Sequence, residues 1–111
     1  MIKIKLIQEN PIVGDISGNL AKAKEEIVIA KKNNVNLIIF SEMFLSGYPP
    51  EDLVMRDDFL DEIAKSIKHI TSLSKETSLV FGAPIKKDGF LYNAAICISE
   101  GNLVETYFKQ I

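Results

Sequence analysis

The sequence has few of the residue types that mark whole classes of protein. Its 111 residues include one cysteine, Cys97, no tryptophan, and a single arginine, Arg56, among thirteen basic residues. One cysteine excludes an internal disulfide framework and a CxxC metal site. Thirteen basic against fifteen acidic residues leave a net charge of -2. This balance argues against a nucleic-acid partner, because phosphate backbones attract clustered positive charge.

Long apolar runs are missing as well. No stretch approaches the roughly 18 apolar residues of a membrane span. The first residues alternate apolar with charged side chains and do not form the apolar centre of a signal peptide. We therefore expect a cytoplasmic protein with no membrane partner. The composition, 47% hydrophobic and 25% charged, is typical of one soluble globular domain.

The first forty residues predict a strand, a helix and a second strand. Apolar residues alternate with lysines over residues 2–6, which is typical of a strand with one buried face that starts at the first residue. Apolar residues spaced three and four apart then predict an amphipathic helix over about 17–33. The apolar run at 35–40 predicts a strand that is covered on both faces and lies in the middle of a sheet.

The remaining residues predict a long connection, a helix and three strands. Gly47, Pro49 and Pro50 make residues 41–55 a connection without regular structure. Helical spacing returns over 56–76. Strands at 78–85, 90–99 and 103–108 are joined by short turns, and such turns permit antiparallel hairpins but no helical crossover. The predicted order is β-α-β-loop-α-β-β-β, an α/β fold.

The predicted elements do not complete a domain. Only two helices are available to cover five strands, and the sequence stops on the apolar Ile111 directly after a strand. We therefore expect an incomplete layered structure.

Two charged residues follow predicted strands and are candidates for catalysis. Glu42 comes directly after the apolar strand at 35–40, and ligands of open α/β sheets bind at the carboxyl ends of strands. A carboxylate in that place can act as a general base. Lys109 follows the last strand, where an ammonium group can stabilise an oxyanion. Taken alone, each residue is better interpreted as an ordinary surface residue, and neither supplies a nucleophile.

Other reactive side chains fit structural roles. Cys97 lies within an apolar strand, without a histidine nearby, and is interpreted as a core residue. His69 lies off the apolar stripe of its helix and has no second ligand at the next turn, so no metal site is expected. The glycines form neither a dinucleotide-binding nor a P-loop motif.

Residues 40–53 carry a resemblance to a known family. They read FSEMFLSGYPPEDL and resemble the nitrilase (carbon-nitrogen hydrolase) superfamily, and the GYPPEDL part is similar to the glutaminase domains of glutamine-dependent NAD+ synthetases. Residues 4–15 are similar to the first strand and loop of that family, and Asn19 to the opening of its first helix. The YFKQ string at 107–110 resembles its lysine motif.

The resemblance implies a fold and roles for three residues. It implies that residues 1–111 are the amino-terminal part of a glutaminase domain, an incomplete α-β-β-α sandwich that ends before the nucleophile. Glu42 would act as general base toward a cysteine thiol, Lys109 would stabilise the tetrahedral intermediate, and Tyr48 would lie near the glutamine pocket. Cys97 precedes Lys109 and does not match the nucleophile of the family, so the chain alone is expected to be inactive.

The resemblance also implies a reaction and partners. The domain would hydrolyse the side-chain amide of glutamine and pass ammonia to a synthetase domain that amidates deamido-NAD+. The glutaminase half would need no cofactor, since ATP and Mg belong to the synthetase domain. Its partners would be glutamine, the missing carboxyl-terminal part and, for the complete enzyme, further copies of itself. One departure is Ser41, where the family often has proline.

Three alternatives remain open at the level of sequence. The chain can be a fragment of another nitrilase-type amidase, such as an ω-amidase or a carbamoyl-amine amidase, since only the GYPPEDL string argues against these. It can be a non-catalytic α/β binding module, although the short strand connections oppose a parallel sheet of that kind. It can also be the inactive remnant of a gene or one half of a split enzyme.

Overall fold

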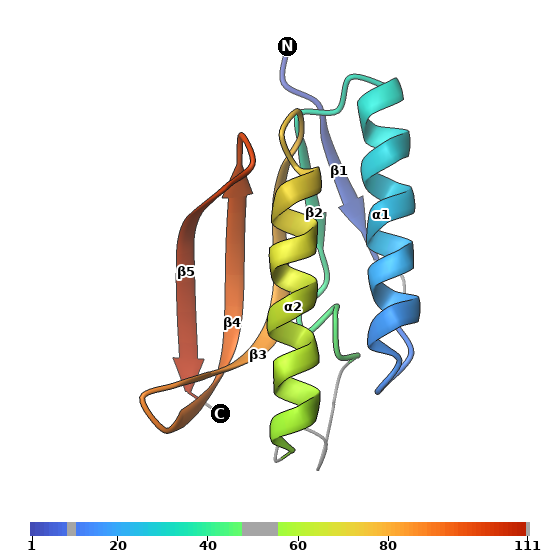
Figure 1. Ribbon diagram of the computed structural model, residues 1–111. Helices are drawn as coiled ribbons and strands as arrows, with labels where there is room; N and C mark the ends of the chain where they lie inside the picture. Colours follow the sequence, from blue (N-terminus) through green and yellow to red (C-terminus); the bar gives the residue numbers. More distant parts are fainter. Residues whose placement is uncertain (9–10, 48–55, 111) are drawn as a thin grey trace.

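The computed structural model describes residues 1–8, 11–47 and 56–110, and it confirms the predicted order of elements (Figure 1). The elements are β1 (Ile4–Ile7), α1 (Ile16–Lys32), β2 (Leu37–Phe40), α2 (Asp57–Leu73), β3 (Ser78–Lys87), β4 (Phe90–Ser99) and β5 (Asn102–Gln110). Several predicted bounds are wrong, the end of β5 among them. The first strand begins at Ile4 and not at the first residue, and α2 ends at Leu73, where the N–H of Ser74 turns back to the carbonyl of Thr71.

The five strands form one mixed sheet in the order β1-β2-β3-β4-β5. Strands β1, β2 and β3 are parallel, whereas β3-β4 and β4-β5 are antiparallel hairpins, as the short turns predicted. Two successive reversals make β5 run in the same direction as β2 (Figure 1). The carboxyl ends of β2 and β5 therefore lie at the same edge of the sheet.

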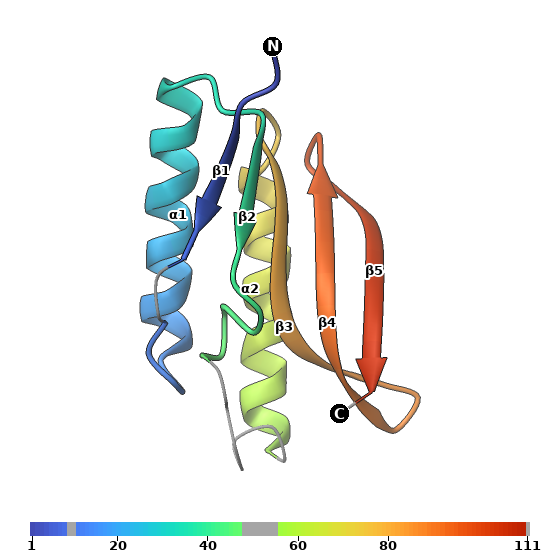
Figure 2. The same ribbon diagram turned by 180° about the vertical axis from the view of Figure 1, so that it is seen from behind.

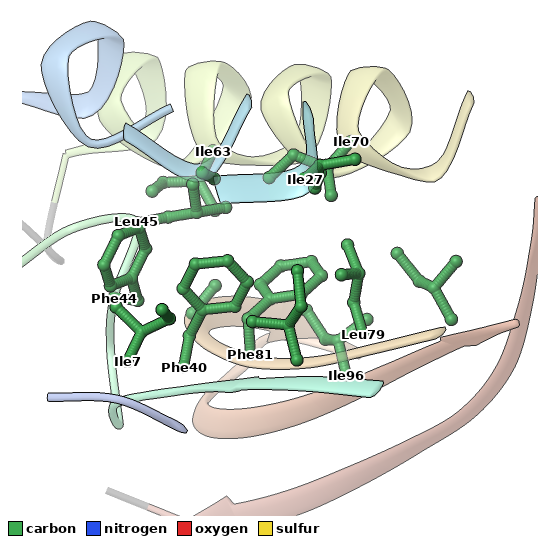
Figure 3. Packing of buried hydrophobic residues seen from close by; sticks show 14 of the residues in the cluster. Ile7, Ile27, Phe40, Phe44, Leu45, Ile63, Ile70, Leu79, Phe81 and Ile96 are labelled. Atoms are coloured by element: carbon green, nitrogen blue, oxygen red, sulfur yellow. The ribbon is translucent and has the colours of Figure 1, made fainter. Parts of the chain in front are cut away.

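Both helices pack on one face of this sheet, and the core lies between the two layers (Figure 3). Ile27 of α1 and Ile63 and Ile70 of α2 lie over the apolar side chains of β2, β3 and β4. The helices begin where local chemistry favours it. The carboxylate of Asp15 accepts the N–H of Gly18 at the start of α1, and acidic residues occupy the first turn of α2 near the positive end of its dipole.

The opposite face of the sheet carries no helix in the described part of the chain (Figure 2). Ile4 and Leu6 point to this face and are more than half exposed, so the prediction that the apolar side of the first strand is buried is wrong here. Cys97 is also on this face and half-buried, so its interpretation as a core residue is wrong here, because its neighbours Ile96 and Ile98 are the residues of β4 that point into the core. In an α-β-β-α sandwich, helices cover one face of each sheet and the other faces of the two sheets pack together. One helix layer and one sheet with an open face therefore correspond to half of such a sandwich.

We expect the open face to make the isolated chain self-associate. Exposed apolar surface of this extent favours association in water. The weight-average mass measured by light scattering should exceed 12.4 kDa as concentration rises. Replacing Ile4 and Leu6 with threonine should lower it, because threonine keeps the strand preference but removes apolar area. Val28→Thr, at a half-exposed position on α1, is the matched control. Equal masses for all three proteins would contradict this expectation.

One charged cluster lies between β1 and α1. Lys5 points toward α1, and its Nζ lies 2.7 Å from Oε2 of Glu26, whose side chain is only 7% exposed. Nζ of Lys22 lies 3.5 Å from the other carboxylate oxygen. Burial acts to raise the pKa of Glu26, but its contact with Lys5 and the charges of Lys5 and Lys22 outweigh burial and hold the pKa below its ordinary value.

The lowered pKa of Glu26 predicts a loss of stability in acid. A carboxylate with a lowered folded-state pKa stabilises the fold above its unfolded-state pKa, and this contribution is lost as the pH falls through the folded-state value. Glu26→Gln should therefore lower the free energy of unfolding at pH 7 by about 1 kcal/mol, and the difference should vanish in strong acid. Urea denaturation followed by circular dichroism measures both. Glu25→Gln, next to it but mostly exposed, should have little effect at either pH, and a pH-independent loss for Glu26→Gln would contradict the assignment.

Candidate active site

The site is built on a tight turn that follows β2. Residues 42–46 form this turn, which we call the Glu42 turn, and the N–H of Gly47 closes it on the carbonyl of Met43 at 2.9 Å. Met43 has a left-handed backbone, with φ of 57°, which is uncommon outside glycine. Phe44 and Leu45 are fully buried. The turn is thus fixed by packing, while Glu42 at its start stays exposed.

Asn19 on α1 ties the Glu42 turn to the loop after β1. Its side chain is buried, accepts the N–H of Ile12 at 3.1 Å, and donates to the carbonyls of Ile12 and Leu45 at 2.9 and 3.0 Å. The N–H of Gly14 donates to the carbonyl of Ser46 at 2.9 Å. These bonds hold the loops that follow two neighbouring parallel strands in one position relative to α1.

Gly82 on β3 lies directly beneath the turn. A Cβ at this position would be 2.4 Å from the backbone nitrogen of Met43 and 3.2 Å from the Cα of Glu42. The N–H of Leu45 also reaches the carbonyl of Gly82, at 3.4 Å. The missing side chain therefore lets the backbone of the Glu42 turn rest on the sheet, which sets the height of the carboxylate above β3.

Lys109 lies inside β5 and not after it, which corrects the predicted end of that strand. It pairs with Asn93 of β4 in the antiparallel register, and Asn93 pairs with Pro84 of β3. Directly paired residues point to the same face of a sheet. Lys109 is therefore on the open face, near the edge at which β2 ends.

The structure brings Glu42 and Lys109 to one hollow of about 210 Å³. The hollow lies on the open face, and its lining comes from the end of β2, the Glu42 turn, β3, β4 and β5; among the lining residues are Ser41, Glu42, Gly82, Asn93, Tyr107 and Lys109. A carboxylate and an ammonium group that share a hollow can together bind a polar substrate, accept a proton and stabilise negative charge.

Asn93 is the residue of this site that sequence reasoning missed. Its Nδ2 donates a hydrogen bond of 2.7 Å to Oε1 of Glu42. The sequence offers one signal in retrospect, because an asparagine is out of place among the apolar residues of a strand interior. The predicted pocket residue Tyr48 lies outside the described residues. His69 is exposed on α2, as predicted.

The part of the chain that the structure describes has neither a cluster of metal-binding side chains nor a membrane-spanning helix. Within it, His, Cys, Asp and Glu side chains do not gather in a group of three or more that could hold a metal ion. Neither described helix is long and apolar enough to cross a membrane.

The sequence of this chain is similar to a family model and to curated proteins. Residues 3–111 match the carbon-nitrogen hydrolase model. The chain is 38% identical to the glutamine-dependent NAD(+) synthetase of Thermotoga maritima, over 97% of this chain and 19% of the relative. It is 34% identical to the protein of that name from Acinetobacter baylyi, over 96% and 20%. The chain thus spans about a fifth of the length of these relatives.

Solved structures share this fold. A glutamine-dependent NAD+ synthetase from Acinetobacter baumannii superposes with a TM-score of 0.89 and 33% identity, over 97% of this chain and 20% of that one. An amidase from Nesterenkonia sp. superposes with a TM-score of 0.82 over 97% of this chain and 42% of the amidase. At 19% identity the amidase shows the fold alone, so the amidase alternative gains little beside the synthetase relatives.

Proposed function

Because the chain belongs to the carbon-nitrogen hydrolase family, we propose that it forms the part of a glutaminase domain that supplies the general base and the oxyanion-stabilising lysine. The domain would release ammonia from glutamine for NAD+ synthesis. The observation that carries the proposal is the shared hollow, which Glu42 and Lys109 both line although they are far apart in the sequence. The relatives that match nearly the whole chain are named as glutamine-dependent NAD+ synthetases.

The two residues have complementary tasks in the proposed reaction. Glu42 takes the proton of a cysteine thiol that the rest of the domain supplies, and the sulfur attacks the amide carbon of glutamine. Lys109 stabilises the oxyanion of the tetrahedral intermediate. The carbon-nitrogen bond then breaks, ammonia leaves with the proton from Glu42, and a thioester remains. Water hydrolyses the thioester, which yields glutamate and restores the thiol.

Several features of the complete enzyme belong to the same proposal. The open face of the sheet would be covered by the remainder of the glutaminase domain. Glutamine would be the substrate, and Tyr48 would lie near its pocket. No cofactor is needed by the glutaminase half, whereas ATP and Mg would act in a synthetase domain. The enzyme would work in the cytoplasm as a homo-oligomer.

A hybrid enzyme tests the proposal. In it, this chain replaces the matched segment of the Thermotoga maritima NAD(+) synthetase, to which it is 38% identical. We expect the hybrid to release ammonia from glutamine, and we expect the 111-residue chain alone to release none. Glu42→Gln and Lys109→Met should each stop the hybrid. A folded hybrid without activity, or one whose activity survives both substitutions, would refute the proposal.

A further inference from the structure

The carboxylate of Glu42 is held by a residue from a strand that is not its neighbour. Glu42 follows β2, Asn93 lies near the start of β4, and β3 stands between them. The bond from Nδ2 of Asn93 to Oε1 of Glu42 is nevertheless 2.7 Å long. On β3, Pro84 is the register partner of Asn93, and Gly82 lies against the backbone of Glu42. The approach of the two side chains therefore depends on the sheet and not on local sequence.

The chemistry of this bond distinguishes the two carboxylate oxygens. A carboxamide NH₂ group only donates, so Oε1 of Glu42 is the acceptor and one of its lone-pair positions is used. A short bond to an ionised carboxylate is also among the stronger hydrogen bonds in proteins. The carboxylate is thereby held against rotation, and Oε2 is left to accept a proton from another group.

The strand register connects this bond to Lys109. Asn93 and Lys109 are directly paired across β4 and β5, and they line the same hollow as Glu42. In the described part of the chain, the side chain that reaches Glu42 is that of Asn93, and Lys109 makes no ion pair with it. One cross-strand pair thus presents a donor that holds the base and an ammonium group that faces the hollow.

We propose that Asn93 is a positioning residue, which holds the Glu42 carboxylate through Oε1 and directs Oε2 toward the group from which it takes a proton. This inference rests on the proposed function for its chemical meaning, but the contact itself can be tested without catalysis. Asn93→Asp preserves the shape of the side chain and removes the donor. Asn102, whose Nδ2 donates to the carbonyl of Glu100 at the other end of the hairpin, provides the matched control.

The first test observes the hydrogen bond directly. The full 111-residue chain, labelled with ¹⁵N-asparagine and kept dilute, is studied by NMR, and the carboxamide signal of Asn93 is assigned by its loss in Asn93→Asp. Glu42→Ala should shift this signal and leave that of Asn102 in place. An unchanged Asn93 signal in Glu42→Ala would overturn the inference, whether or not the hybrid enzyme is active.

The second test measures the consequence for the reaction. In the hybrid enzyme, Asn93→Asp and Asn93→Ala should lower kcat by about tenfold to a hundredfold, because a misplaced base reacts poorly. KM should stay unchanged, and Asn102→Asp should match the parent. An unchanged kcat in an active hybrid would overturn the role. An inactive parent hybrid together with the shifted NMR signal would count against the proposed function and leave the contact established.

Discussion

Phe44→Ala should lower the free energy of unfolding by about 3–5 kcal/mol, the usual loss when a buried phenylalanine is truncated. Phe44 is 1% exposed, and its ring centroid lies 4.7 Å from that of Phe40, at an interplanar angle of 50°. The ring fills the space beneath the Glu42 turn at the end of the core (Figure 3). Its loss would remove both apolar contact and the support of the turn.

The loss expected for Phe44→Ala is a large fraction of the free energy of unfolding of a domain. Small domains are stable by about 5–15 kcal/mol, so the variant should be near its unfolding midpoint under mild conditions. Chemical denaturation followed by circular dichroism at low micromolar concentration provides the measurement. A second variant, Phe44→Leu, retains most of the volume and should lose clearly less.

Phe90→Ala is the control for Phe44→Ala, because it removes the same side chain from a position that is 56% exposed. We expect it to change stability by less than about 1 kcal/mol. If the two alanine variants were equally stable, Phe44 would not be docked in solution. The Glu42 turn would then lack the rigid base on which the proposed site depends.

Much of this arrangement was predictable from strand direction alone. The apolar run before Glu42 indicated a strand in the middle of a sheet, and the short turns after residue 85 permitted antiparallel hairpins but no helical crossover, which the two observed hairpins confirm. Two reversals return the last strand to the direction of β2. That simple count places Glu42 and Lys109 at one edge, before any side chain is considered.

Other features could not be read from the sequence. Alternation in β1 defined two faces, but it could not show which face the helices cover, and the apolar side proved to be open. The alternation in β4 likewise does not show which face the helices cover, and Cys97, predicted to lie in the core, is on the open face. The role of Asn93 was even harder to predict, because its contact with Glu42 depends on the register of β4 and on the position of the Glu42 turn relative to β3. Such contacts depend on tertiary structure, which local patterns do not encode.

Gly82→Ala should displace the Glu42 turn, and its effect should be far larger than the addition of one methyl group suggests. All three nearest atoms to the added Cβ are backbone atoms, at 2.4 to 3.2 Å, in Glu42 and Met43. Backbone held by the buried Phe44 and by the bond from Asn19 to Leu45 has little freedom to retreat. We expect a loss of about 3 kcal/mol in stability, at the upper end for overpacking.

The same substitution should affect catalysis in the hybrid enzyme more than it affects substrate binding. A shift of about 1 Å in a catalytic group can lower the rate about a hundredfold, and the added methyl group would push on the atoms that carry the carboxylate. The comparison that isolates this cause is Gly89→Ala. Gly89 has a φ of 81° but nothing within 4 Å of the added Cβ. The Gly89→Ala variant should lose about 1 kcal/mol in the free energy of unfolding through backbone strain, while its kcat stays unchanged. If both variants lost kcat equally, general destabilisation would explain the loss, whereas a loss confined to Gly82→Ala means that the close contact of β3 with the Glu42 turn sets the position of the base.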